Sequence, residues 1–309
     1  MSEMYEQGTD VRLLSSLLPR LPSKVVIDAG AERGGFTQAF LDHRAELVVA
    51  IEPYPPNVDA LRKRFAAEPR VTILDLALGE RDDTASLHLI EDRKGENTSS
   101  YHSLRARRDT EMLHTVGQLT VSCRALSSLL EEGAFPRKVG ILKIDAEGHD
   151  FGILRGLGAL APLVVMIEFW DDLPGGVGER LFSLADVDAF MKARGYHHVA
   201  VVKRYEGFET IWIDDVRTRP GDWGNAIFLH ESAFSRMPVE ISQAAADAHV
   251  ELIDKAVFFR KECGLRLQVI EEQARALDAH NTEAARWKAA PIGERVKQAL
   301  RGTKRRFPA

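Results

Sequence analysis

The sequence contains few cysteines, no long apolar run and no secretory signal. Its two cysteines, Cys123 and Cys263, lie far apart and outside any CxxC spacing, which disfavours a disulfide framework or a cysteine-ligated zinc site. No apolar run approaches the ~20 residues that span a bilayer, and the first residues lack the basic and then apolar order of a signal peptide. We therefore expect reduced thiols, no transmembrane segment and a cytoplasmic location.

A basic body is also absent. The chain of 309 residues has a formal net charge of -5. Residues 286–309 hold eight Lys or Arg and one acid, a balance of 8 − 1 = +7, which leaves 33 − 45 = −12 for residues 1–285. An acidic body disfavours binding to a nucleic-acid backbone, so no nucleic-acid partner is expected. The basic tail is either solvated or in contact with an anionic membrane surface, which would place the protein at the inner membrane face.

Short β-rich runs alternate with segments of helical period between about residues 24 and 170. This alternation predicts an α/β fold, a doubly wound Rossmann-like sheet that is mostly parallel, with helices on both faces. The predicted strands are nearly all apolar, as strands buried on both faces should be. They cover residues 24–29, 46–52, 71–77, 140–146 and 162–168. The predicted helices cover residues 34–44, 55–68 and 150–160.

The remaining segments predict how the domain is completed. Short strands at 84–90 and 119–123 flank a long polar loop, and a helix over 186–196 precedes a strand-rich end that includes an antiparallel strand closing the sheet. Residues 239–288 have helical spacing and suit a C-terminal helical extension, which either forms a homodimer or packs on the domain as a lid. The expected division is a helical segment over 1–23, a Rossmann-like domain over 24–235, and a helical extension with a basic tail over 236–309.

A glycine-rich turn follows the first predicted strand. The strand ends at Asp28, and Gly30, Gly34 and Gly35 follow, where glycine lets the backbone turn sharply and approach a ligand closely. The spacing is not GxGxxG, which disfavours a nicotinamide-dependent oxidoreductase. Glu52 ends the second strand about twenty residues later, where a carboxylate can accept both ribose hydroxyls of an adenosine-containing ligand. Asp75, after the third strand, either meets the adenine amino group or is a solvated strand-end residue.

The segment ILKIDAEGHD, residues 141–150, concentrates ionisable groups at the end of a buried strand. Strand alternation places Lys143 and Asp145 on one face, so we expect Lys143 to pair with Asp145 or with Glu168 of the neighbouring strand. Asp145 and Glu147 are expected to face the cleft at the carboxyl ends of the strands. His149 is either a general base, a helix cap or a solvent-facing residue. The candidates for taking a proton from an acceptor hydroxyl are Asp145, His149 and Glu168.

Asp145 and Glu168 could instead ligate Mg²⁺, with Asp171 or Asp172 as a further ligand. A site for such a hard cation normally needs a third protein ligand, and the sequence does not place one, so a site without metal is expected. The acceptor-binding parts are expected in the polar loop over 91–117 and in a glycine-rich segment. The residues proposed for them are His102, Arg105, Arg107, Arg108, Gly175, Gly176 and Gly178.

Over about residues 25–215 the chain resembles the FkbM family of S-adenosylmethionine-dependent methyltransferases. The stretches that carry the resemblance are IDAGAERGGF, VVAIEPYPPNVDAL, LALGE, NTSS, ILKIDAEGHDFGILRGL and VVMIE. The resemblance implies a class I methyltransferase fold and S-adenosylmethionine as cofactor, with Asp145 beside its methionine end. The family usually has Asn at the position of Glu32. The expected cofactor-binding residues are Asp28, Gly30, Glu32, Gly34, Gly35, Glu52, Asp75, Ala77 and Asp145; the expected catalytic residues are Asp145, His149, Glu168 and Lys143.

The resemblance implies hydroxyls of glycans, glycolipids or polyketides as acceptors. The first hypothesis is therefore an O-methyltransferase that acts on a sugar, a glycan or a related hydroxylated metabolite. The second is a cofactor-binding scaffold without catalysis in a glycan or glycolipid assembly pathway.

Overall fold

A computed structural model describes residues 8–92, 101–105, 113–170, 182–205, 208–212, 218 and 222–234. The chain divides into two compact units, Met1–Val250 and Glu251–Ala309, and every described residue lies in the first. The predicted C-terminal extension, its homodimer contact and the contact of the basic tail with a membrane lie outside the described residues and stay predictions. Among the helices that the structure describes, none has the length and apolar character needed to cross a bilayer.

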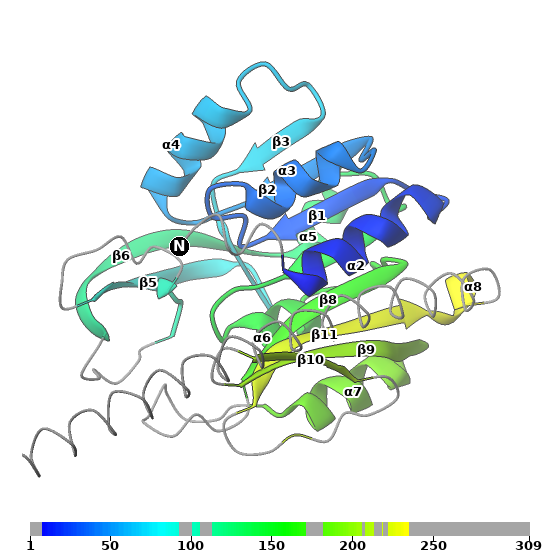
Figure 1. The fold of residues 1–309 in the computed structure, drawn as a ribbon. Helices are drawn as coiled ribbons and strands as arrows, with labels where there is room; N and C mark the ends of the chain where they lie inside the picture. Colours follow the sequence, from blue (N-terminus) through cyan, green and yellow to red (C-terminus); the bar gives the residue numbers. More distant parts are fainter. Residues whose placement is uncertain are drawn as a thin grey trace, which may run out of the picture. The chain divides into compact units, whose positions relative to one another are not determined.

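The main sheet of the described residues has eight strands in the order β10-β9-β11-β8-β7-β1-β2-β3 (Figure 1). β1 pairs in parallel with β2 and β7, β2 with β3, and β7 with β8, whereas β11 is antiparallel to both β8 and β9. The prediction of a mostly parallel, doubly wound sheet with an antiparallel closing strand is therefore confirmed. The bounds are β1 Val25–Ala29, β2 Leu47–Ile51, β3 Val71–Leu74, β7 Ile141–Ile144, β8 Val164–Trp170, β9 Tyr196–Tyr205, β10 Phe208–Trp212 and β11 Trp223–His230.

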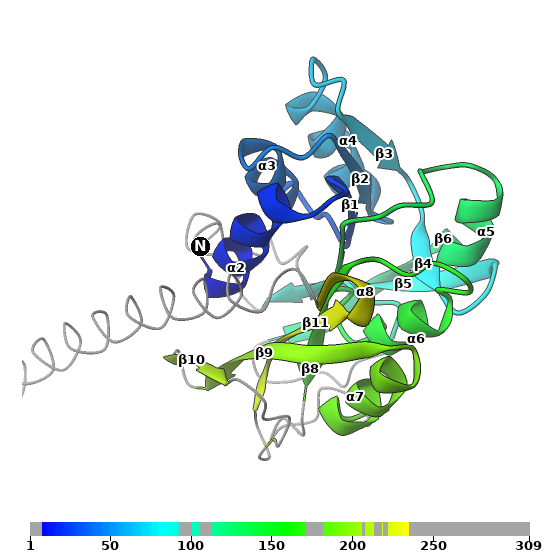
Figure 2. The same cartoon turned by 90° about the vertical axis from the view of Figure 1, so that its right-hand side faces the viewer.

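Helices cover both faces of this sheet. Figure 2 shows α2 and α3 on one side and α5, α6 and α7 on the other. The helix α2 lies within the segment predicted as helical at the N-terminus. It buries an apolar face because Leu13, Leu14 and Leu17 are within four residues of one another. The bounds are α2 Thr9–Leu17, η1 Leu18–Arg20, α3 Gly35–Asp42, α4 Pro55–Arg64, α5 Leu126–Glu131, α6 Asp150–Arg155, α7 Leu184–Ala193 and α8 Glu231–Phe234.

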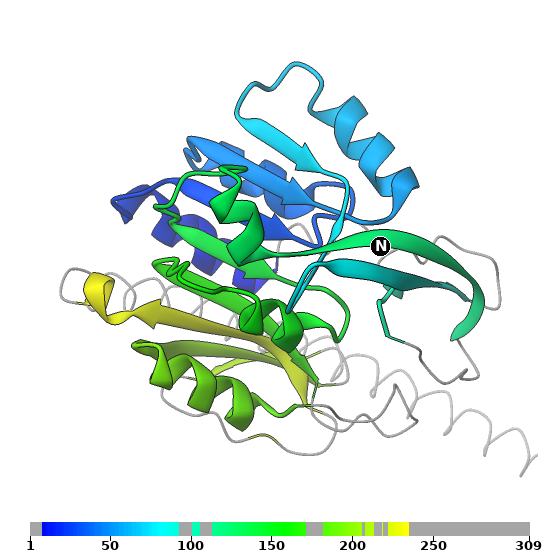
Figure 3. The same ribbon diagram turned by 180° about the vertical axis from the view of Figure 1, so that it is seen from behind.

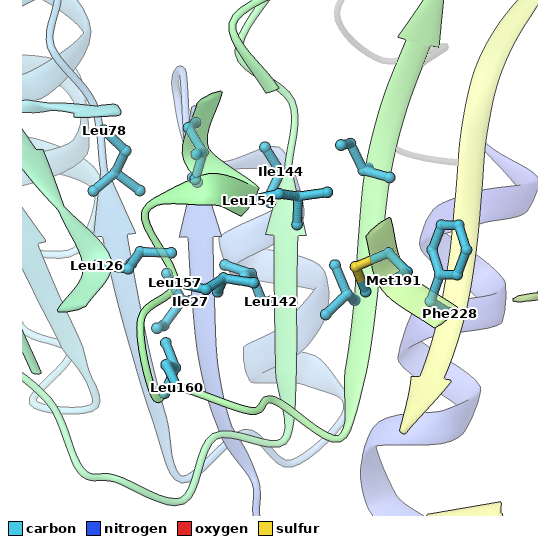
Figure 4. Packing of buried hydrophobic residues seen from close by; sticks show 14 of the residues in the cluster. Ile27, Leu78, Leu126, Leu142, Ile144, Leu154, Leu157, Leu160, Met191 and Phe228 are labelled. Atoms are coloured by element: carbon cyan, nitrogen blue, oxygen red, sulfur yellow. The ribbon is translucent and has the colours of Figure 1, made fainter. Parts of the chain in front are cut away.

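The alternation of side chains along the central strands separates the core from the polar groups. Ile27 of β1 and Leu142 and Ile144 of β7 face α6 and α7, where they pack with Leu154 and Met191 (Figure 4). All five are buried, and burial of each such side chain contributes roughly 1.5–3 kcal/mol. The residues between them in sequence face the opposite side, toward α2 and α3, and these include the ionisable groups of the candidate site.

A second, three-stranded sheet leaves the main sheet after β3 (Figure 3). It has the order β4-β6-β5, with β4 Ala77–Gly79, β5 Asp83–Asp92 and β6 Leu113–Ala125. The prediction of one strand over 71–77 is wrong, because β3 ends at Leu74 and β4 pairs with Cys123–Ala125 of β6 instead of with β2. The strands predicted at 84–90 and 119–123 are confirmed as parts of β5 and β6, which pair antiparallel.

Candidate active site

The glycine turn between β1 and α3 is packed directly against the end of β7. Gly30 and Gly34 have φ angles of 75° and 84°, a conformation that side chains rarely adopt. A Cβ atom on Gly30 would lie 1.9 Å from the carbonyl oxygen of Asp145, and one on Gly34 would lie 2.5 Å from the Phe65 ring. The turn therefore needs glycine at both positions, and Gly35 begins α3 directly after it.

Asp28 lies beneath the glycine turn. Its side chain is fully buried; Thr37 Oγ1 donates to Oδ2 over 2.6 Å, and Lys143 Nζ lies 3.2 Å from Oδ1. Both oxygens are thus directed into the protein. Asp28 was expected to hold the cofactor, and that role stays a prediction; the contacts in this structure link β1, α3 and Lys143 under the loop.

Lys143 has a different main partner from the two predicted for it. The pairing of β1 with β7 places Asp28 directly beside Lys143, whereas Asp145 Oδ2 is 3.9 Å from the ammonium group. The ammonium also donates to the carbonyls of Ala29 and Gly30, over 3.2 and 2.7 Å. Burial alone would lower the pKa of Lys143, but the charges of Asp28 and Asp145 outweigh it and raise the pKa. Lys143 is therefore a permanent cation that binds the turn to the sheet.

Glu52 is held at the carboxyl end of β2 with its carboxylate fixed by backbone groups. Its Oε2 accepts from the N–H of Glu32 over 2.9 Å, and its Oε1 accepts from the N–H of Tyr54 and the amide of Asn57. A carboxylate offers about four acceptor positions, so with three of them used, one position on Oε2 remains for a hydroxyl donor. Burial raises the pKa of Glu52 to about 7, although the hydrogen bonds oppose the shift. A fixed acid beside a turn with glycine at Gly30 and Gly34 fits the ribose of an adenosine-containing cofactor.

Glu32 reaches Glu52 through its backbone. Its φ angle of 49° is uncommon outside glycine, and Asn is enriched there, which accounts for the Asn that the resembled family usually has at this position. Because the contact with Glu52 is made by the backbone N–H, it does not depend on the side chain. The side chain of Glu32 is exposed.

Three carboxylates gather at the carboxyl ends of β7 and β8. One oxygen each from Asp145, Glu147 and Glu168 lies within 4.8 Å of the others. The loop that carries the first two is held by buried Asp150, which accepts from the N–H groups of Ala146 and Gly148 over 2.9 Å each. Burial, together with the charges of Asp145, Glu147 and Asp150, raises the pKa of Glu168 well above its usual value. The predicted grouping of acids at this edge is therefore present, with Glu147 as a full member.

His149 does not belong to this group of acids. It occupies the position directly before α6, but its side chain makes no capping hydrogen bond to the helix. Its Nε2 lies 3.3 Å from where a Cβ of Gly79 would be and 3.1 Å from that of Gly152, so the ring packs between β4 and α6. Burial and the charges of Arg105 and Arg155 lower the pKa of His149. The ring is turned toward the second sheet.

The two residues predicted near the adenine lie in different environments. Asp75 is half-exposed, and its Oδ2 is 3.4 Å from the guanidinium of Arg62, which matches the alternative reading of a solvated strand-end acid. Ala77 is buried in a small apolar cluster of the second sheet, against which Tyr54 packs. Of these two residues, Ala77 lies closer in the structure to the segment after Glu52, because Tyr54 packs against its cluster.

A short segment over 101–105 contacts both the residue Tyr54 after β2 and the loop that carries Asp145 and Glu147. The sequence did not predict this contact. The His102 ring meets the Tyr54 ring edge to face at 4.4 Å, and Ser103 Oγ donates to the carbonyl of Glu147 over 2.7 Å. Arg105 also donates to the carbonyl of Gly148. The serine could have been found only from the strand pairing of its backbone with His88. The other residues proposed for acceptor binding, and Asp171 and Asp172, lie outside the described residues.

The sheet order with an antiparallel closing strand, the glycine turn after β1 and the acid after β2 define a Rossmann-like methyltransferase domain. The model of the family described as methyltransferase FkbM domain matches residues 28–197, more than half of the chain. The chain belongs to this family of S-adenosylmethionine-dependent methyltransferases, so it is a methyltransferase and its cofactor is S-adenosylmethionine. A comparison with curated protein sequences found no match.

Several solved methyltransferase structures are similar at low identity. Precorrin-6y C5,15-methyltransferase from Geobacter metallireducens is 12% identical, with a TM-score of 0.37 over 72% of this chain and 88% of that one. TrmK of M. capricolum in complex with S-adenosylhomocysteine is 7% identical, with a TM-score of 0.40 over 72% and 69%. A SAM-dependent methyltransferase from Aquifex aeolicus is 12% identical, with a TM-score of 0.35 over 74% and 96%. Each TM-score is below 0.5, so these likenesses say nothing about the acceptor.

The raised pKa of Glu52 predicts that cofactor affinity increases with pH. Below pH 7 the folded protein holds a proton on Glu52, whereas hydroxyl donors of a bound ribose require the carboxylate, so binding releases that proton. We expect calorimetry with S-adenosylhomocysteine to give a Kd at pH 6 that is about 10-fold higher than the plateau above pH 8. Glu52→Gln should remove this dependence, and Glu131→Gln, at an exposed residue of α5, should keep it. A Kd that stays constant with pH in the unmodified protein would contradict the assignment.

Proposed function

We propose that the chain transfers the methyl group of S-adenosylmethionine to a hydroxyl group of a sugar, a glycan or a related hydroxylated metabolite. The observation that carries the proposal is the group formed by Asp145, Glu147 and Glu168 within 4.8 Å at the carboxyl ends of β7 and β8. Ligands of open α/β sheets bind at this edge. A carboxylate whose pKa is raised by neighbouring acids can accept the proton that a bound hydroxyl loses, a step that O-methylation requires and transfer to a neutral amine does not.

Each residue has a defined part in this proposal. S-adenosylmethionine supplies an electrophilic methyl group, whose bond to sulfur breaks as the acceptor oxygen attacks. Glu52 and the turn from Gly30 to Gly34 would hold the cofactor, while Asp28 and Lys143 keep the turn in place. The acids of β7 and β8 would receive or stabilise the proton that the acceptor hydroxyl loses. Glu168 is better suited to this than His149, because it lies within the acid group and its pKa is raised.

The chemistry of the product tests the proposal. The full chain is incubated with S-adenosylmethionine labelled in its methyl group and with fractionated extract of the host cells, and the labelled species are isolated. We expect label that survives mild alkali, as an ether does and an ester does not, and that hydriodic acid releases as iodomethane. Label attached to nitrogen, carbon or a carboxyl group would contradict O-methylation while leaving the methyltransferase assignment intact. No labelled product from any fraction, despite cofactor binding, would favour the non-catalytic scaffold.

A further inference from the structure

The three carboxylates at the ends of β7 and β8 have the spacing of ligands around one ion. Oxygens that bind a common Mg²⁺, Mn²⁺ or Ca²⁺ lie roughly 2.0–2.6 Å from it, and therefore about 3 to 5 Å from one another. One oxygen each of Asp145, Glu147 and Glu168 lies within 4.8 Å of the others, which meets this condition before any side chain moves. The three residues come from two adjacent strand ends, so the sheet itself sets the spacing.

Lys143 is a buried cation beside these acids, but its main partner is Asp28. Lys143 Nζ is 3.9 Å from Asp145, but it is closer to Asp28 at 3.2 Å and donates to two backbone carbonyls. The charge of Lys143 is therefore balanced mainly by Asp28 and by the two carbonyl oxygens, and less by Asp145. Carboxylates this close repel one another in a buried environment, and a divalent cation would relieve that repulsion directly.

A second observation is independent of the spacing. Glu168 is 6% exposed, and its Oε2 is buried without a hydrogen-bond partner among the residues that the structure describes. Asn225 of β11, 4% exposed, is the direct pairing partner of Glu168, so the two side chains share a face of the sheet. Its Nδ2 donates to Asp10, which leaves Oδ1 likewise without a donor in the described part of the chain. One buried oxygen of the acidic group and one buried oxygen of the residue paired with it therefore lack a donor in the described part of the chain, and a bound cation would satisfy such oxygens.

We propose that Asp145, Glu147 and Glu168 bind one divalent cation of the oxygen-preferring class of Mg²⁺ and Mn²⁺, next to the oxygen of Asn225. The sequence expectation of a site without metal depended on the lack of a third protein ligand, and the structure supplies Glu147 in that position. The role of the ion rests on the proposed function: it would bind the acceptor hydroxyl, lower its pKa and orient its oxygen for attack on the methyl carbon. With the ion bound, the acids act as ligands and no longer take the proton themselves. The hydroxyl proton passes to water, and the C–O bond forms as the C–S bond breaks.

Binding of Mn²⁺ measured by electron paramagnetic resonance tests the site without reference to activity. The full chain is freed of metal with EDTA, dialysed and titrated with MnCl₂ in the presence and absence of S-adenosylhomocysteine. We expect one Mn²⁺ per chain, displaced by MgCl₂, and at least a 10-fold higher Kd for Mn²⁺ in Asp145→Asn and in Glu168→Gln. Glu131→Gln, an exposed acid on α5, should leave the Kd for Mn²⁺ unchanged. Thermal melting and the Kd for S-adenosylhomocysteine report whether each variant is folded.

Two outcomes would overturn the site: no saturable Mn²⁺ binding by the unmodified chain, or equal weakening in Glu131→Gln and in folded Glu168→Gln. Failure of the proposed function is a separate result. A methyl group found on nitrogen or carbon, with Mn²⁺ binding as expected, would remove O-methylation and keep the cation site. An O-methylated product formed at an undiminished rate in EDTA would remove the cation and keep the function.

Discussion

Gly30→Ala should raise the Kd for S-adenosylhomocysteine by about 100-fold. The added Cβ would lie 1.9 Å from the carbonyl oxygen of Asp145, so the turn and the end of β7 must move apart by an ångström or more. That movement displaces the turn from Glu52, and misplacement on this scale costs on the order of 10²-fold at a site that depends on alignment. It also pulls the carbonyl of Gly30 away from Lys143, which donates to it over 2.7 Å. Calorimetry with S-adenosylhomocysteine measures the loss.

Gly133→Ala is the matched control for the steric part of this effect. Gly133 has a φ angle of 77°, close to the 75° of Gly30, but no atom lies within 4 Å of the position of its Cβ. The substitution should cost only the backbone strain of a left-handed alanine, about 1 kcal/mol of unfolding free energy, and leave the Kd unchanged. If Gly30→Ala bound the cofactor as tightly as Gly133→Ala, the close packing of the turn on β7 would be refuted.

Lys143→Met should lower the free energy of unfolding by about 3–5 kcal/mol, because it leaves the fully buried carboxylate of Asp28 without its cation. Asp28→Asn should be costly as well, since it removes the closest charge from a Lys143 that is only 2% exposed. The double variant should recover part of the loss, because a buried amide and a thioether need no counter-charge. Urea unfolding without cofactor measures all three, and the absence of cofactor removes any contribution from binding.

An exposed ion pair of similar length gives the comparison. Arg155 Nη2 lies 3.1 Å from Glu80 Oε2, but the two side chains are 49% and 55% exposed. Arg155→Met should therefore change the free energy of unfolding by less than about 1 kcal/mol. Equal losses in Lys143→Met and Arg155→Met would mean that the pair with Asp28 is screened by water, contrary to its burial.

The sequence allowed the layers of the sheet and the position of its acids to be predicted, because both follow from local pattern. Apolar runs gave β1, β2, β7 and β8, and Asp145 and Glu168 follow from where those runs end. The main partner of Lys143, Asp28, could not be predicted from these local patterns. Alternation tells which face a side chain occupies, but the pairing of Asp28 with Lys143 depends on the register between β1 and β7, which are separated by more than a hundred residues.

The second sheet and the orientation of His149 were missed for a related reason. The run over 71–77 looks like one strand, yet Ala77–Gly79 leave the main sheet because β6 offers them a partner. That partner also sets His149, whose ring fills the space that Gly79 and Gly152 leave open. Both features depend on contacts between segments distant in sequence, and the hydrophobic periodicity of a single segment does not predict such contacts.

The hydrogen bond from Asn225 to Asp10 joins residues 215 positions apart, near the two ends of the described chain. Both side chains are buried, and the hydrogen bond between them cannot form until β11 has taken its place between β8 and β9. During synthesis, α2 and the turn after β1 emerge from the ribosome long before that strand does. The contact of Asp10 at the start of α2 with Asn225 can therefore form only late in translation. When β11 joins the sheet, it completes both this contact and the surroundings of Glu168.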